Sequence, residues 1–129
     1  MAGRILLVEP DVLLGAVLGE VLRRSGYEVI FVRTLEGQAE RIHSVSAVIL
    51  DLDTVFAERE LSWLDLLQSS FESLPIVLLG LYSPEHLHHH LRLHVGRRQA
   101  EHLAWVQKPF RNEELLAAVR RVNWNSLVG

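Results

Sequence analysis

The stretch Ala47-Val48-Ile49-Leu50-Asp51 decides the fold of this chain of 129 residues. Four apolar residues run directly into a carboxylate, which is typical of a buried strand that ends at the edge of a sheet. A strand without polar alternation is buried on both faces, and this favours a parallel sheet covered by helices. Ligands bind at the carboxyl edge of such a sheet, so we expect Asp51 to lie in the functional site.

Four more apolar runs predict strands, and stretches with helical periodicity separate them. The predicted strands cover residues 5–8, 27–32, 45–51, 75–79 and 103–106, and the predicted helices cover 11–25, 35–42, 56–71, 83–94 and a last segment capped by Asn112. Five strand–helix units in strict alternation predict one α/β domain over residues 1–129. Right-handed crossovers then predict a doubly wound, five-stranded parallel sheet with helices on both faces.

The first predicted helix has clear end signals and two internal glycines. Pro10 suits its first turn, and Gly26 suits its end. Gly15 and Gly19 each cost about 1 kcal/mol relative to alanine inside a helix. Because they are four residues apart they share one face, which indicates close packing of that face on the sheet.

Composition narrows the classes of function. The chain is 49% hydrophobic with a net charge of −3, so bulk charge indicates neither nucleic-acid nor membrane-surface binding. It has no cysteine, which excludes disulfides, thiolate zinc sites and cysteine nucleophiles. No apolar run approaches the ~20 residues of a membrane span, and no signal peptide is evident, so we expect a cytoplasmic protein. The sequence lacks a glycine-rich phosphate loop and an evident serine–histidine pair, so we do not expect an enzyme in the usual sense.

Three charged residues follow predicted strands and carry the expected chemistry. Glu9 and Asp51 each end an apolar run, and Lys108 follows the fifth run. In a parallel sheet all three lie at the same edge. Carboxylates can hold a magnesium ion, and an ammonium can neutralise a phosphoryl group. An aspartate can also be the nucleophile that forms an acyl phosphate.

These stretches resemble the receiver domains of bacterial two-component response regulators, over essentially the whole chain. The matching segments are Ile5–Glu9, Val48–Leu52, Pro75–Leu79 and Lys108–Phe110, in the family's order and spacing. The resemblance implies a flavodoxin-like strand order, 2-1-3-4-5. It also implies that Asp51 is the phosphoacceptor and that Lys108 senses the phosphate.

The resemblance further implies a magnesium site. Glu9 takes the first position of the family's acidic pair, and Asp51 is a second ligand. Asp53 lies where the family presents a main-chain carbonyl to the metal, so its side chain is not required. The second acid is replaced by Pro10, and Asp11 substitutes for it only if the turn allows, because one helical residue rotates a side chain by about 100°.

Other pocket positions depart from the family pattern. Gly80 stands where a hydroxyl residue contacts the phosphoryl group. Trp105 takes the place of the aromatic switch, and its bulk is expected to resist swinging inward. Residues 54–56 replace the usual loop of proline and glycine. Since each change removes a part that binds metal or phosphate or that reports phosphate binding, we expect weak magnesium binding. As an alternative in an inactive pocket, Glu9 simply pairs with Lys108.

Three hypotheses about function follow. The first is a phosphorylation-gated receiver that takes its phosphoryl group from a sensor histidine kinase. It would signal, or form a homodimer, through the fourth helix, the fifth strand and the fifth helix. The second is a phosphorylation-independent pseudo-receiver that acts as an interaction module. The third is a metal- or pH-sensing domain that uses His86, His90 and His94 on one helical face. We expect no nucleic-acid-binding unit and no membrane segment in this chain.

Overall fold

The computed structural model describes residues 3–53, 74–81 and 103–128, with side chains as far as residue 122. The strands are β1 (Arg4–Val8), β2 (Glu28–Val32), β3 (Ala47–Asp51), β4 (Ile76–Gly80) and β5 (Leu103–Gln107), and the helices are α1 (Val12–Arg24), α2 (Ala39–Ile42) and α5 (Asn112–Val128). The helices predicted over 56–71 and 83–94 lie outside the described residues, and with them the histidines of the segment 83–94.

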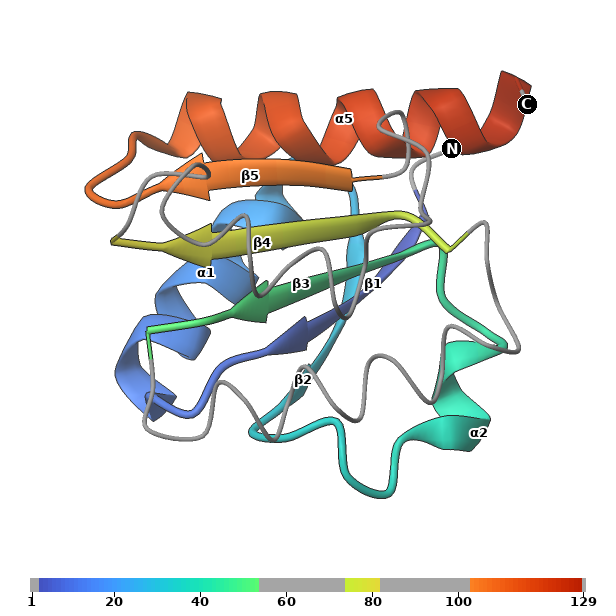
Figure 1. Ribbon diagram of the computed structural model, residues 1–129, viewed down its shortest axis with the longest axis horizontal. Helices are drawn as coiled ribbons and strands as arrows, with labels where there is room; N and C mark the ends of the chain where they lie inside the picture. Colours follow the sequence, from blue (N-terminus) through green and yellow to red (C-terminus); the bar gives the residue numbers. More distant parts are fainter. Residues whose placement is uncertain (1–2, 54–73, 82–102, 129) are drawn as a thin grey trace, which may run out of the picture.

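All five strands form one parallel sheet in the order β2-β1-β3-β4-β5, as predicted. The arrowheads of β3, β4 and β5 point to the same side of the molecule (Figure 1). The carboxyl ends of the strands therefore meet at one edge. The order changes direction between β1 and β3, and ligand sites of doubly wound sheets lie at such a point.

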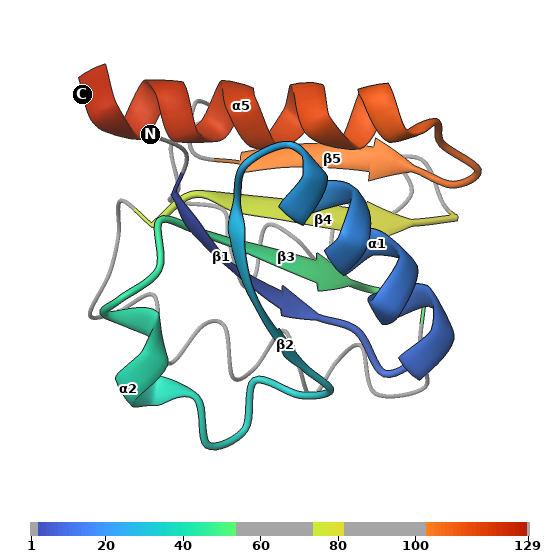
Figure 2. The ribbon, with the colours of Figure 1, turned by 180° about the vertical axis from the view of Figure 1, so that it is seen from behind.

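Two apolar cores cover the two faces of the sheet. Seen from behind, α1 crosses one face and α5 runs along β5 (Figure 2). The core on that face contains Ile5, Leu7, Leu18, Leu22, Ile49, Val77, Leu79, Leu115, Val119 and Val122 among others. The opposite core contains Leu6, Val8, Leu35, Ile42, Val48, Leu50, Ile76 and Leu78 among others. Since Ile42 belongs to α2, helices lie on both faces, as predicted for a doubly wound sheet.

Helix α1 begins one residue later than expected and is capped by a side chain. Asp11 is the N-cap, and its Oδ1 accepts hydrogen bonds from the amides of Leu13 (2.9 Å) and Leu14 (3.1 Å). The placement of Pro10 in the first helical turn was wrong, because Pro10 precedes this cap. The predicted end is confirmed, since Gly26 has a φ of 96° just beyond the helix.

The two glycines of α1 have different surroundings. A Cβ atom on Gly15 would lie 2.1 Å from Cζ of Phe31 on β2, so this glycine allows the helix to approach the sheet. The nearest neighbour of a Cβ atom on Gly19 would be the end of the Arg23 side chain, at 3.3 Å. The expectation of close packing on the sheet is therefore confirmed for Gly15 and wrong for Gly19.

Helix α2 is much shorter than the predicted segment 35–42. The chain forms a turn in which the Gln38 amide donates to the Leu35 carbonyl (3.1 Å), and Gly37 has a φ of 80°. A left-handed residue cannot continue a right-handed helix, so only Ala39–Ile42 is helical. None of the helices in the described ranges is long and apolar enough to cross a membrane.

Candidate functional site

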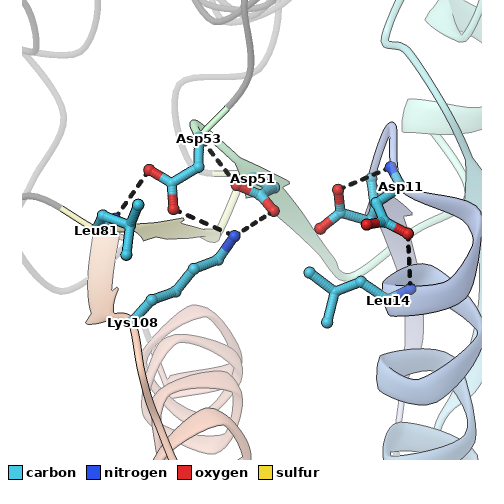
Figure 3. Close-up of polar contacts among 7 residues, drawn as sticks. Asp11, Leu14, Asp51, Asp53, Leu81 and Lys108 are labelled. Atoms are coloured by element: carbon cyan, nitrogen blue, oxygen red, sulfur yellow. Dashed lines mark hydrogen bonds and ion pairs between the residues drawn. The ribbon is translucent and has the colours of Figure 1, made fainter.

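The backbone brings Asp51 and Lys108 together at the carboxyl edge of the sheet. Asp51 is the last residue of β3, and Lys108 directly follows β5. The Lys108 amide donates to the Gly80 carbonyl (2.8 Å), which ties the end of β5 to β4. The Lys108 ammonium Nζ then lies 2.6 Å from Asp51 Oδ2 (Figure 3). This buried ion pair is the centre of the candidate site.

Asp51 is a buried carboxylate with several donors. Its side chain is only 3% exposed, and its Oδ1 accepts a hydrogen bond from the Asp53 amide (2.8 Å). Burial alone would raise the pKa of Asp51. Hydrogen bonds from Glu9, Lys108 and the Asp53 amide outweigh that effect and hold its pKa below 3.8. Asp51 is therefore an anion at neutral pH, as a nucleophile must be.

Lys108 holds two carboxylates and not one. Its Nζ lies 3.2 Å from Asp53 Oδ2 in addition to its contact with Asp51. Burial alone would lower the pKa of Lys108, but the two carboxylates outweigh it and raise the pKa above 10.5. The alternative in which Glu9 pairs with Lys108 is wrong, because the ammonium is directed to Asp51 and Asp53.

Glu9 follows β1 and is buried beside Asp51. Its amide donates to the Val32 carbonyl (3.0 Å), and its Oε2 accepts from the Asp11 amide (3.1 Å). Its Oε1 is buried and receives no hydrogen bond from the described part of the chain. Burial, together with a hydrogen bond to Asp51 that requires a proton on Glu9, raises the pKa of Glu9 to about 8. Glu9 is thus mainly neutral at pH 7.

Asp11 is used at the start of α1 and not at the ion pair. Its Oδ1 holds the first helical turn, and Figure 3 shows its carboxylate beside Leu14, away from the Lys108 ammonium. Its amide positions Glu9 through the bond to Oε2. We expected Asp11 only as a substitute metal ligand. An aspartate directly before a helical apolar pattern is a helix-cap signal, and this signal was missed.

The side chain of Asp53 is a part of the site that sequence reasoning missed. We expected only its main chain to matter, but its carboxylate is 12% exposed and binds Lys108. Its Oδ1 also accepts a hydrogen bond from the Leu81 amide (2.9 Å), just beyond β4. The predicted strand order could have indicated this contact, because Asp53 and Leu81 follow the neighbouring strands β3 and β4.

The position of the Trp105 ring requires a glycine at residue 80. A Cβ atom on Gly80 would lie 2.6 Å from Trp105 Cη2 and 3.0 Å from Cζ2, so the indole occupies the space of a side chain at residue 80. The indole also packs on the core formed with α2. Gly80 leaves room for the ring at this position, and the expectation that the bulk of Trp105 resists a swinging motion stays a prediction. The indole Nε1 is buried and has no hydrogen-bond partner in the described ranges.

The donor set at this edge suits a hard divalent cation. It offers the side-chain oxygens of Glu9 and Asp51, with the main-chain carbonyl of Asp53 as the third ligand that the resemblance implies. Glu9 Oε1, which is buried and accepts no hydrogen bond from the described residues, is available to a cation once Glu9 has lost its proton. Magnesium bound by so few protein ligands keeps several waters. Within the described ranges, no group of three or more acidic or histidine side chains is arranged to hold a metal ion.

Several sequence predictions concern residues outside the described ranges. They include the histidine face with His86, His90 and His94, and the loop over residues 54–56. They also include the fourth helix, predicted over residues 83–94, which belongs to the expected signalling surface. These predictions stay predictions.

Solved structures share this fold. The CheY-like response regulator receiver domain protein of Methanospirillum hungatei JF-1 has a TM-score of 0.77 and 18% identity, with 100% of both chains covered. The chemotaxis response regulator CheY4 of Vibrio cholerae has a TM-score of 0.73 and 23% identity, over 95% of this chain and 99% of that chain. NtrX of Brucella abortus has a TM-score of 0.74 and 22% identity over 99% of this chain, which spans 28% of the NtrX chain.

No protein-family model and no curated protein match the sequence. The structural likeness nevertheless extends over nearly the whole chain and includes the strand order. The chain has the fold of the response regulator receiver domains.

Proposed function

We propose that this chain is a receiver module of two-component signalling, in which Asp51 accepts a phosphoryl group from a sensor histidine kinase. The observation that carries the proposal is the buried Asp51 carboxylate, 2.6 Å from the Lys108 ammonium at the carboxyl end of the central strand. The low pKa of Asp51 supports this role, because the carboxylate is the nucleophilic form. We place the module in the cytoplasm, where such a kinase would present its phosphohistidine.

The reaction is a direct transfer to a carboxylate. A carboxylate oxygen of Asp51 forms a bond to phosphorus, the bond between phosphorus and the histidine nitrogen breaks, and the imidazole leaves with the electron pair. Lys108 stabilises the negative charge on the phosphoryl oxygens. A magnesium ion, when bound by Glu9, Asp51 and the Asp53 carbonyl, adds positive charge for the same purpose.

Strand β5 and the turn that follows it support a signalling surface. Strand β5 carries Trp105, and the turn after it carries Lys108, so a change at the ammonium can reach the exposed side of β5 and α5. We propose that a partner or a second copy of the chain binds the surface of residues 83–94, β5 and α5. The segment 83–94 lies outside the described residues.

Mass spectrometry tests the acceptor role. Incubation with acetyl phosphate and magnesium should add about 80 Da to the chain, the mass of one phosphoryl group. The adduct should be absent from Asp51→Asn and present in Asp11→Asn, which changes a neighbouring carboxylate outside the nucleophile. An adduct of equal yield on Asp51→Asn would place the chemistry elsewhere and contradict the proposal.

A phosphorylation-independent module is the second candidate, and Gly80 favours it. The residue has no hydroxyl to bind a phosphoryl oxygen, and Trp105 fills the space where a side chain would stand. A switch needs contacts that differ between its two states, and this pocket has lost one of them. Failure of the chain to form an adduct, with partner binding unchanged in Asp51→Asn, is the result that this second candidate predicts.

A further inference from the structure

The carboxylate of Asp53 fills the space between the ends of β4 and β5. Its Oδ1 accepts a hydrogen bond from the Leu81 amide (2.9 Å), and its Oδ2 lies 3.2 Å from the Lys108 ammonium. In Figure 3 the side chain turns toward both donors. With 12% of the side chain exposed, this anion is largely withdrawn from water.

One of these donors, the Lys108 ammonium, lies against the proposed acceptor, and the other, the Leu81 amide, is linked to it through Asp53. Lys108 Nζ also contacts Asp51 Oδ2 (2.6 Å), and the Asp53 amide contacts Asp51 Oδ1 (2.8 Å). A phosphoryl group on Asp51 would bring three oxygens and nearly two negative charges to this position. Such a group would compete with Asp53 for the Lys108 ammonium, and the Leu81 amide, now bonded to Asp53, is a further main-chain donor at this edge. Gly80 offers no hydroxyl as a replacement donor.

We propose that the Asp53 carboxylate is an internal anionic ligand, which occupies the donors that a phosphoryl group on Asp51 requires. The inference rests on the proposed function, because it concerns regulation at the same acceptor. Phosphorylation then requires the Asp53 side chain to leave Lys108 and Leu81. Otherwise the Asp53 carboxylate and the phosphoryl group, both anionic, would share one ammonium, and like charges at this distance repel.

The arrangement also has a consequence for signalling. In the unphosphorylated chain Lys108 is already held by two anions, so a phosphoryl group that displaces Asp53 replaces one anionic partner of the lysine by another. The contacts of Lys108 therefore differ less between the unphosphorylated and the phosphorylated chain. Phosphorylation can then shift the conformation of the β5 surface only weakly. Asp53 accordingly sets how readily the site accepts a phosphoryl group and how strongly the chain responds to it.

Substitution of Asp53 tests the inference. Asp53→Ala frees both donors, while Asp53→Asn keeps the shape and an acceptor for the Leu81 amide but removes the charge. Glu28→Gln is the matched control, because it removes one carboxylate from an exposed ion pair with Arg4 at the opposite edge of the sheet. The binding probe is beryllium trifluoride with magnesium, and the chemical shift of the Leu81 amide follows its binding. The chemical probe is acetyl phosphate with magnesium.

We expect both Asp53 variants to bind beryllium trifluoride at least about tenfold more tightly than the unchanged chain, which corresponds to the gain of one strong interaction. Glu28→Gln should not differ from the unchanged chain. The asparagine variant separates the effect of charge from a loss of packing, and it serves alone if the alanine variant does not fold. Equal affinity in all four proteins would overturn the inference.

Acetyl phosphate separates this inference from the proposed function. An adduct that forms faster and lasts longer on both Asp53 variants supports both. An adduct with the same yield and lifetime in all proteins overturns the inference and leaves the acceptor role intact. Tighter binding of beryllium trifluoride without any adduct on Asp51 supports the internal ligand and contradicts the proposed phosphoryl transfer.

Discussion

At the scale of single residues, Lys108 balances two carboxylates that are largely removed from water. Asp51 is 3% exposed, and removal of the ammonium takes away the cation that the described part of the chain places at Asp51 and Asp53. We expect Lys108→Met to lower the free energy of unfolding by about 3 kcal/mol, since breaking a buried pair leaves an uncompensated charge. Urea unfolding at pH 7 measures this change.

The control for this variant is an exposed ion pair. Glu20→Gln breaks the pair between Arg24 and Glu20 on the surface of α1 and should change stability by no more than about 0.5 kcal/mol. The double variant Lys108→Met with Asp51→Asn should recover part of the loss, because the buried charge is removed as well. Equal effects of the Lys108 and Glu20 substitutions would contradict the assigned role of burial.

Glu9 predicts a dependence of stability on pH. Its pKa is about 8 in the folded chain and near 4.5 when unfolded, so the folded chain holds more protons between these values. The free energy of unfolding should therefore fall as pH rises from about 4.5 to 8, by at most about 1.4 kcal/mol per pH unit. The lowered pKa of Asp51 affects stability in the opposite direction: its stabilising contribution is present at neutral pH and is lost only as pH falls below 3.8.

Comparison with Glu9→Gln isolates this effect from the titration of histidines. The amide of glutamine can donate to Asp51 without a titratable proton, so the variant should lose the extra slope between pH 5 and 8. We expect a difference of about 3 kcal/mol over this range, measured by urea unfolding without added divalent metal. Parallel curves for the two proteins would show that Glu9 is ionised throughout.

At the scale of elements, the two glycines of α1 predict substitutions of opposite sign. Gly15→Ala places a Cβ atom 2.1 Å from Phe31 Cζ, and overpacking of this kind costs about 1–3 kcal/mol. Gly19→Ala meets only the flexible end of Arg23 and should gain about 0.5–1 kcal/mol from helix propensity. Thermal unfolding measures both, and Phe31→Leu should relieve the cost at residue 15. The same sign for both glycines would contradict the packing described for α1.

The contact between β4 and β5 predicts a paired substitution. Gly80→Ser restores a hydroxyl at the pocket but drives a Cβ atom to 2.6 Å from the Trp105 ring. We expect the single variant to lose about 1–3 kcal/mol and to shift tryptophan fluorescence as the indole moves. Adding Trp105→Leu makes room for the serine and should restore most of the stability. Without such a rescue, the ring would not be the cause.

The elements themselves follow from the sequence wherever a local signal decides them. Apolar runs predicted all five strands to within one or two residues. A strand in a covered parallel sheet can be identified from its own apolar residues, without knowledge of the strands it pairs with. The helix over 35–42 was overestimated, since the left-handed φ of Gly37 is a property of the turn and not of the apolar pattern. The contact between Gly80 and Trp105 depends on two strands that are adjacent only in the folded sheet.

At the scale of the whole molecule, the site was predictable in outline and not in detail. The parallel order placed Asp51 and Lys108 at one edge, and this was confirmed. The role of the Asp53 side chain was missed, because it depends on where the Leu81 amide points after β4. The family resemblance implied a role only for the main chain of Asp53. In this chain the side chain of Asp53 also contacts Lys108, the lysine that binds Asp51.

One sheet separates two cores, and β3 belongs to both. Ile49 packs on the face covered by α1 and α5, and Leu50 packs on the face that includes α2. Both residues are fully buried, so truncation of either to alanine should cost about 2–5 kcal/mol. Because both cores are built on the same strands, neither can lose its packing without disturbing the sheet that supports the other.

We therefore expect Ile49→Ala and Leu50→Ala to lower the midpoint of a single urea transition, without a second transition in either protein. Far-ultraviolet circular dichroism reports the sheet and helices. Tryptophan fluorescence, recorded in a background with Trp63→Phe and Trp124→Phe, reports the face that holds Trp105, and the two curves should coincide. Ile49→Val, with a cost of about 0.5–1.5 kcal/mol, serves if the alanine variants do not fold. Separate transitions in the two signals would mean that the cores unfold independently, and that a change at the Asp51 edge of the sheet need not reach both faces.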